Sequence, residues 1–132
     1  MIVKTPELNS LVENYSESEL ITSTTAKVYQ DKLVLNIITN YTGQYIIKFY
    51  CETAISLVAE RVFVRVIEGI NVCAEVCPPV KENYTNGQWL PIVSFKKIDL
   101  TKGVLYTFRL QFKVSNGTGY IRRARFLFRR IF

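Results

Sequence analysis

The strongest structural signal in the sequence is Val104–Val114, which reads VLYTFRLQFKV. Apolar and polar side chains alternate along it, which is the pattern of a β-strand that buries one face. The side chains expected on the buried face are Val104, Tyr106, Phe108, Leu110, Phe112 and Val114. The side chains expected on the opposite face are Leu105, Thr107, Arg109, Gln111 and Lys113. Such a strand needs partners, and the flanking segments supply them.

Further strand-forming segments lie on both sides of this one, separated by short turns. They are Leu20–Tyr29, Lys32–Thr39, Gln44–Glu52, Glu60–Ile67, Ile70–Cys77, Pro91–Asp99 and Tyr120–Phe132. No helical pattern separates them, and parallel strands would need helical crossovers. The sequence therefore predicts an all-β fold over residues 20–132, an antiparallel β-sandwich of the jelly-roll type. The segment Lys32–Thr39 is nearly continuous in apolar residues, which predicts a strand buried on both faces.

Residues 1–19 carry a different pattern. Thr5 is a suitable helix cap and Pro6 suits the first helical position, so we expect a short N-terminal helical segment over residues 5–16. Its apolar stripe consists of Leu8, Leu11, Val12 and Tyr15. A helix of this length is not stable alone. We expect residues 1–19 to dock onto a larger assembly; the alternative is that the stripe covers an open edge of the sandwich.

Composition indicates one globular domain and argues against an enzyme. The chain has 132 residues, 48% of them apolar. It contains no histidine, which excludes histidine-based catalysis, and its three cysteines are too few for an all-cysteine zinc site. No phosphate-binding glycine loop or nucleophile elbow is present. We therefore expect no catalytic residues, no cofactor and no metal. No apolar run is long enough to span a membrane, and the N-terminus does not resemble a signal peptide.

Positive charge is concentrated near the C-terminus. Residues 96–132 carry a net charge of +9, whereas residues 1–95 carry −3. An anionic partner is one explanation. The last strand carries Arg122, Arg123, Arg125, Arg129 and Arg130, and simple alternation places these on both faces. Pairing between copies with Glu52, Glu60, Glu68 or Glu75, or solvated display, is then favoured over nucleic-acid binding, which needs a one-sided display with exposed aromatic side chains.

Four segments, taken in order, resemble a known superfamily. They are Gly43-Gln44-Tyr45-Ile46-Ile47 leading to Phe49, Arg61–Ile67 with its Glu68-Gly69 turn, Leu100–Gly103 before Tyr106-Thr107-Phe108, and Gly117-Thr118-Gly119-Tyr120-Ile121. Over residues 20–132 the chain resembles the trimeric jelly-roll heads of the tumour necrosis factor and complement globular-head superfamily, in their phage and bacterial versions. The resemblance implies a threefold head that binds a receptor, a glycan or another virion protein.

Two sets of side chains are candidates for binding. Aromatic residues of the last two strands are expected at a trimer axis, with core packing as the alternative: Tyr106, Phe108, Phe112, Tyr120, Phe126 and Phe128. The long loop over residues 80–90 combines flat aromatics with amides, as sugar-binding sites do: Tyr84, Asn86, Gln88 and Trp89. The alternative is that Trp89 closes one end of the sandwich.

The cysteines allow two interpretations. Cys73 and Cys77 lie on one strand, roughly 13 Å apart when extended, so they cannot bridge each other without a bend. Cys51 is able to pair with either of them across strands. Buried free thiols are the favoured alternative.

Together these observations predict a non-enzymatic virion structural or attachment protein. We expect a homotrimer that serves as a phage fibre head, decoration protein or baseplate-associated protein, with other virion proteins or a cell-surface receptor or glycan as partners. A glycan-binding module or bacterial adhesin head, located outside the cell or at its surface, is the alternative. A basic nucleic-acid-binding protein is the second alternative.

Overall fold

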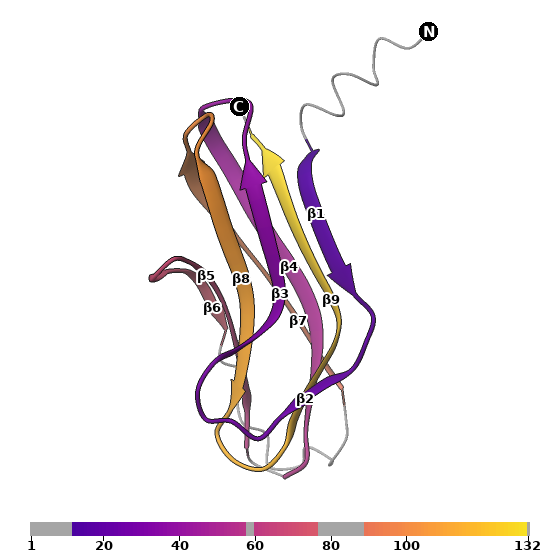
Figure 1. Cartoon of the computed structure of the whole chain (residues 1–132). Helices are drawn as coiled ribbons and strands as arrows, with labels where there is room; N and C mark the ends of the chain where they lie inside the picture. The colour runs from indigo at the N-terminus through magenta and orange to yellow at the C-terminus, as the bar shows by residue number, and fades with distance from the viewer. Residues whose placement is uncertain (1–11, 58–59, 77–88, 132) are drawn as a thin grey trace, which may run out of the picture.

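The computed structural model describes residues 12–57, 60–76 and 89–131, with the backbone alone described for 12–16. These residues form strands and no helix. The strands are β1 (Val12–Ser18), β2 (Thr22–Thr24), β3 (Gln30–Ile38), β4 (Gly43–Ile55), β5 (Val62–Glu68), β6 (Asn71–Val76), β7 (Leu90–Leu100), β8 (Leu105–Val114) and β9 (Gly119–Arg130). They make two antiparallel sheets that face each other (Figure 1).

The strands pair in a nested order. β5 pairs with β6, β4 with β7, β3 with β8, and both β1 and β2 with β9. Pairs β4–β9 and β5–β8 complete a five-stranded sheet, β1-β9-β4-β7 with β2 beside β9, and a four-stranded sheet, β3-β8-β5-β6. A long antiparallel ribbon rolled up in this way is a jelly roll. The predicted all-β, antiparallel jelly-roll sandwich is therefore confirmed.

The core lies between the sheets and is built from the alternating side chains that the sequence indicates. In β4, Tyr45, Ile47, Phe49 and Cys51 are buried, and in β5, Val62, Val64 and Val66 are buried. The ring of Phe108 lies 4.3 Å from that of Phe128, which lies 5.3 Å from that of Phe126 (centroid distances). Contacts of this kind join the two sheets because Phe108 belongs to one and Phe126 and Phe128 belong to the other.

This core corrects the predicted trimer axis. Phe108, Phe112, Phe126 and Phe128 are each 0% exposed within a single chain, so they have no surface left to offer to another copy. The alternative, core packing, is right for these four residues. Tyr106 is partly exposed and packs against the same core, and Tyr120 is also partly exposed.

The predicted N-terminal helix is wrong where the structure describes it. Val12–Ser18 is strand β1, and Tyr15 lies opposite Leu127 of β9. Without β1, this edge of β9 would have unpaired backbone groups. Pairing with β9 stabilises Val12–Ser18 as a strand, whereas a short isolated helix is not stable. Leu8 and Leu11 lie outside the described residues. The division into a docking segment, 1–19, and a domain, 20–132, remains a prediction.

Strand β3 also differs from expectation, because it is buried on one face only. Leu33, Leu35 and Ile37 face the core, whereas Val34 is 42% exposed and Ile38 is 61% exposed. The continuous apolar run therefore covers the core and also leaves an apolar outer surface.

Candidate functional site

A β-bulge places Arg122, Arg123 and Arg125 of the last strand on one face. Arg122 lies opposite Glu52 and Arg125 opposite Tyr50, so one extra residue is accommodated between these two pairs. Arg123, within the bulge, has a φ of 50°, which is a left-handed conformation that arginine rarely adopts. The expected display on both faces is therefore wrong for this part of β9. These three arginines point away from the core, on what we call the outer face of the five-stranded sheet. Further along β9, Arg129 shares this face, whereas Arg130 lies opposite the buried Tyr45, so the expected alternation holds for that pair.

Glu52 organises one end of the outer face. Its carboxylate accepts hydrogen bonds from Arg122 Nε at 2.7 Å, Tyr50 Oη at 2.8 Å and Arg123 Nη1 at 3.4 Å. The Arg122 hydrogen bond, followed by that of Tyr50, holds the pKa of Glu52 below its usual range. The same contact with Glu52 raises the pKa of Tyr50. These side chains are thus fixed relative to one another before any ligand arrives.

Trp89 joins this cluster from the start of β7. The guanidinium carbon of Arg122 lies 3.9 Å from the centroid of the Trp89 ring, in cation–π contact. Trp89 is partly exposed, so part of its ring remains accessible to a ligand. Its predicted companions in the ligand loop, Tyr84, Asn86 and Gln88, lie outside the described residues. The contributions of Arg122 and Glu52 were missed, since only the strand register brings them to Trp89.

Strand β7 forms one border of the outer face and adds apolar side chains to it. Val93 is 65% exposed and lies opposite Tyr50, and Phe95 is 64% exposed and lies opposite Lys48. Trp89 and Phe95 share this face and are separated by roughly 20 Å at about 3.4 Å per residue. The outer face therefore carries three aromatic side chains, Trp89 and Phe95 on the β7 side and Tyr50 on β4. Cations lie beside them.

The acids that pair with β9 belong to the same chain. Arg125 contacts Glu17 at 3.6 Å and Glu19 at 2.7 Å, and Arg123 contacts Glu19 at 3.8 Å. Of the acids expected to pair between copies, Glu52 pairs here within its own chain. The exposed pairs contribute little to stability. Their effect is to neutralise the middle of the outer face.

The two described cysteines are free and buried in different sheets, Cys51 in β4 and Cys73 in β6. The pairing of Cys51 with Cys73 is therefore not formed, and Cys77 lies outside the described residues. Burial raises the pKa of the Cys51 thiol to about 12, with the neighbouring Glu52 charge adding to the effect. Such a thiol is an inert core group.

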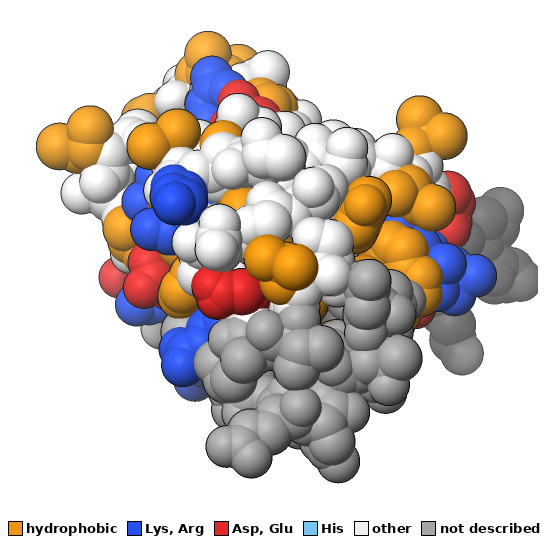
Figure 2. Space-filling model, turned by 90° about the horizontal axis from the view of Figure 1, so that it is seen from below, with side chains coloured by type: hydrophobic (Ala, Val, Ile, Leu, Met, Phe, Trp, Pro, Cys, Tyr) orange, Lys and Arg blue, Asp and Glu red, His pale blue; other side chains and the backbone are white. Residues whose placement is uncertain are grey.

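The Trp89 cluster lies towards the lower end of the sandwich in Figure 1, where β4 ends and β7 and β9 begin. Figure 2 looks at this end, and hydrophobic, basic, acidic and other side chains are interspersed over its described surface. Among residues 12–57, 60–76 and 89–131, no three His, Cys, Asp or Glu side chains are grouped so that they hold a metal ion. No helix in that part of the chain is long and apolar enough to cross a membrane.

Comparison with solved structures supports the fold. The chain matches part of dimeric latent PorU from Porphyromonas gingivalis (TM-score 0.61, 9% identity, 91% of this chain, 13% of PorU). It also matches part of D431N VP2 of infectious bursal disease virus (TM-score 0.56, 11% identity, 89% of this chain, 32% of VP2). The chain thus spans about an eighth and a third of these two proteins. At these identities the likeness establishes the fold alone.

A weaker match concerns a whole domain of similar size. The C-terminal CBM6 of LamC, a marine laminarinase from Zobellia galactanivorans, gives a TM-score of 0.42 at 16% identity, over 86% of this chain and 99% of that one. A match at this level supports no argument about the ligand. No protein-family model and no curated protein matches the sequence. The tumour necrosis factor-like family therefore remains a resemblance.

Proposed function

We propose that this chain is a non-enzymatic attachment module, displayed on a virion or cell surface, that binds carbohydrate at the Trp89 end of the outer face. The observation that carries the proposal is the cluster of Trp89, Arg122 and Glu52. A partly exposed indole provides a flat apolar surface, and the charged pair beside it provides hydrogen-bonding groups in a fixed position. Ligand sites combine an apolar or aromatic lining with a few well-placed polar groups in this manner.

The fixed geometry of the cluster strengthens the proposal. Glu52 accepts hydrogen bonds from Tyr50, Arg122 and Arg123 at once. Ligand binding therefore loses little further conformational entropy in these side chains. The strands that hold them are hydrogen-bonded along their length, β9 to β4 and β4 to β7. The outer face is open and elongated, which suits one segment of a polymer better than a small enclosed molecule.

The test is a glycan-array screen followed by calorimetric titration of each saccharide found. Trp89→Ala should weaken binding about tenfold or more, because an aromatic ring at the centre of a site is a typical binding hot spot. Phe63→Ala is the control: it removes a partly exposed aromatic side chain from β5 of the other sheet, away from the outer face. Equal effects of the two substitutions, or no saccharide bound by the wild-type chain, would count against the proposal.

A second candidate is a structural virion subunit that assembles as a homotrimer. It is favoured by an exposed apolar pair on the outer side of the four-stranded sheet, Ile38 opposite Leu105, each 61% exposed. Val34 and Val104 are also exposed, at 42% and 43%. Exposed apolar patches mark interfaces. The fold is shared with VP2, which forms T=1 particles.

Light scattering tests this candidate. A mass of three chains at micromolar concentration, reduced to one chain by Leu105→Asp, is the expected result. The substitution Val93→Asp is the control, because it places the same charge at an exposed apolar position on the other sheet. A wild-type chain that stays monomeric contradicts this candidate without affecting the attachment proposal.

A further inference from the structure

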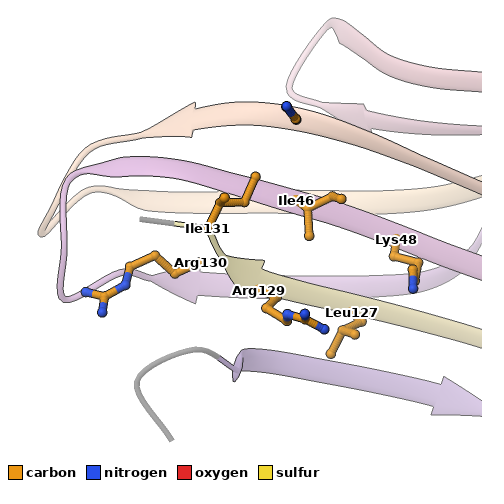
Figure 3. Close-up of a pocket in the computed structure, with 7 residues that line it drawn as sticks. Ile46, Lys48, Leu127, Arg129, Arg130 and Ile131 are labelled. Carbon is orange, nitrogen blue, oxygen red and sulfur yellow. The ribbon is translucent and has the colours of Figure 1, made fainter. Parts of the chain in front are cut away.

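A recess lies on the outer face, at the end away from Trp89. It is half-open, with a volume of about 410 Å³, and we call it the basic pocket. Its lining residues are Ile46 and Lys48 of β4, Lys97 of β7, Leu127, Arg129 and Arg130 of β9, and Ile131. Figure 3 shows Ile46, Leu127 and Arg129 close together on one side of the sheet. Along β7, Lys97 is eight residues from Trp89, or roughly 27 Å at about 3.4 Å per residue.

The cations of the basic pocket lack acidic partners among the residues that the structure describes, unlike the arginines nearer the start of β9. Arg122, Arg123 and Arg125 all pair with glutamates. Among the described residues, Arg129 has no such partner. The same is true of the pocket's other cations, Lys48, Lys97 and Arg130. Like charges gathered without counter-charges repel one another, and a bound anion removes that repulsion.

Arg130 is held by stacking instead of by an acid. Its guanidinium carbon lies 3.9 Å from the centroid of the Tyr41 ring. Its Nε is buried and has no hydrogen-bond acceptor in the described part of the chain. In Figure 3 the side chain extends from β9 away from Ile46 and Leu127, along the end of the sheet. Arg130 therefore adds positive potential at the pocket's outer end, while Lys48, Lys97 and Arg129 surround its centre.

The floor of the basic pocket is apolar. Ile46 lies opposite both Lys97 and Arg129, so one apolar side chain separates two cations on neighbouring strands. Leu127 lies opposite Lys48 and adds a second apolar side chain beside a cation. At the open end, the Ile131 N–H donates to the Gln44 carbonyl at 2.8 Å, which keeps Ile131 beside the pocket. A ligand that fits must combine an apolar face with acidic groups at its edge.

We infer that the basic pocket binds an acidic sugar, a saccharide unit that carries a carboxylate or a sulfate. The acid lies among Arg129, Lys97 and Lys48, and the C–H face of the ring packs on Ile46 and Leu127. Taking the ligand to be a carbohydrate rests on the proposed function; the preference for an acid rests on the pocket alone. An acidic polysaccharide that follows the outer face is long enough to reach Trp89 and the basic pocket together.

Nucleic acid fits the same surface less well. A single strand needs a basic groove along several phosphates, with aromatic rings that stack on successive bases. Within the described part of the chain no aromatic side chain lines the basic pocket, and Arg122, Arg123 and Arg125 are already neutralised by Glu17, Glu19 and Glu52.

The experiment compares two arginines of the same strand and face. Calorimetric titrations at one ionic strength would use an oligogalacturonate, a sulfated oligosaccharide, a neutral gluco-oligosaccharide, an oligothymidylate and phosphatidylglycerol vesicles. Arg129→Gln should weaken acidic-saccharide binding about tenfold, as expected for loss of one close charge pair. Arg125→Gln removes the same charge from a residue that already has acidic partners, and should weaken it less than about twofold.

The outcomes separate this inference from the proposed function. Equal losses for Arg129→Gln and Arg125→Gln, or neutral and acidic saccharides bound equally by the wild-type chain, overturn the inference. Preferred binding of oligothymidylate or of vesicles also overturns it. An acidic preference that depends on Arg129 and persists in Trp89→Ala upholds it. If Trp89→Ala leaves all saccharide binding unchanged, the proposed role of Trp89 fails while the basic pocket stands.

Discussion

Replacing Phe108 by alanine tests the division between core and surface on which the account depends. Phe108 is 0% exposed, and its ring lies 4.3 Å from that of Phe128 across the sandwich. Burying roughly 200 Å² of apolar surface at about 25 cal/mol per Å² contributes up to about 5 kcal/mol. Measured losses for buried Phe→Ala substitutions are about 3–5 kcal/mol. For a domain of this size we expect the melting temperature to fall by roughly 10–20 °C.

Thermal unfolding followed by circular dichroism measures this effect, and Phe95→Ala is the control. Phe95 is 64% exposed on the outer face, so the same substitution should cost no more than about 0.5 kcal/mol. Both variants should be measured over a range of protein concentrations. A melting temperature within a few degrees of wild type for Phe108→Ala would refute the assignment of Phe108 to the core. A loss that grows on dilution would show that Phe108 lies between copies.

Three further predictions concern individual groups. Because Arg122 lowers the pKa of Glu52, the stabilisation from this carboxylate is present above the ordinary glutamate pKa and is lost as pH falls through the lower, folded-state value. The difference in unfolding free energy between wild type and Glu52→Gln should therefore shrink in acid, and a pH-independent difference would contradict this. The buried Cys51 thiol, with a pKa of about 12, should be labelled by a disulfide reagent at pH 8 only as fast as the protein unfolds, with mass spectrometry locating the label; rapid labelling of Cys51 would be inconsistent with its burial. Arg123→Gly should be more stable than Arg123→Ala by about 1 kcal/mol in denaturant unfolding, because both lose the ion pairs and only glycine relieves the φ of 50°; equal stability would argue against the bulge.

Alternation along the chain was sufficient to predict the fold. In β8, Phe108, Leu110, Phe112 and Val114 are buried as a period of two predicts, and the same holds for Tyr45–Cys51 in β4. Two expectations for this segment are wrong: Gln111 is buried as well, and Val104, which precedes β8, is 43% exposed. The turns were predicted to within one residue: the first is Gly69-Ile70 instead of Glu68-Gly69, and the second covers residues 115–118 because Gly119 begins β9. Gly69 and Gly117 adopt positive φ values. Such features depend on residues close in sequence, which is why one sequence suffices to find them.

The candidate site was only partly predictable, because it depends on long-range register. Trp89 is identifiable from composition, but its contact with Arg122 requires β7, β4 and β9 to lie side by side. The bulge at Arg123 shifts the face on which later residues point, and no local motif signals it. Val12 and Tyr15 fit a helical stripe as well as they fit β1, and only the free edge of β9 decides between them.

Chemical shifts of the backbone amides and of the Trp89 indole N–H, recorded during titration with a saccharide found on the array, test the central claim most directly. If the outer face of the five-stranded sheet is the binding surface, the largest shifts will fall on the Trp89 indole and on residues of β7, β4 and β9 around Glu52 and Arg122. An acidic saccharide will extend them towards Lys97 and Arg129. Shifts confined to the four-stranded sheet, β3-β8-β5-β6, would contradict the account, as would titration to saturation with no shift at Trp89.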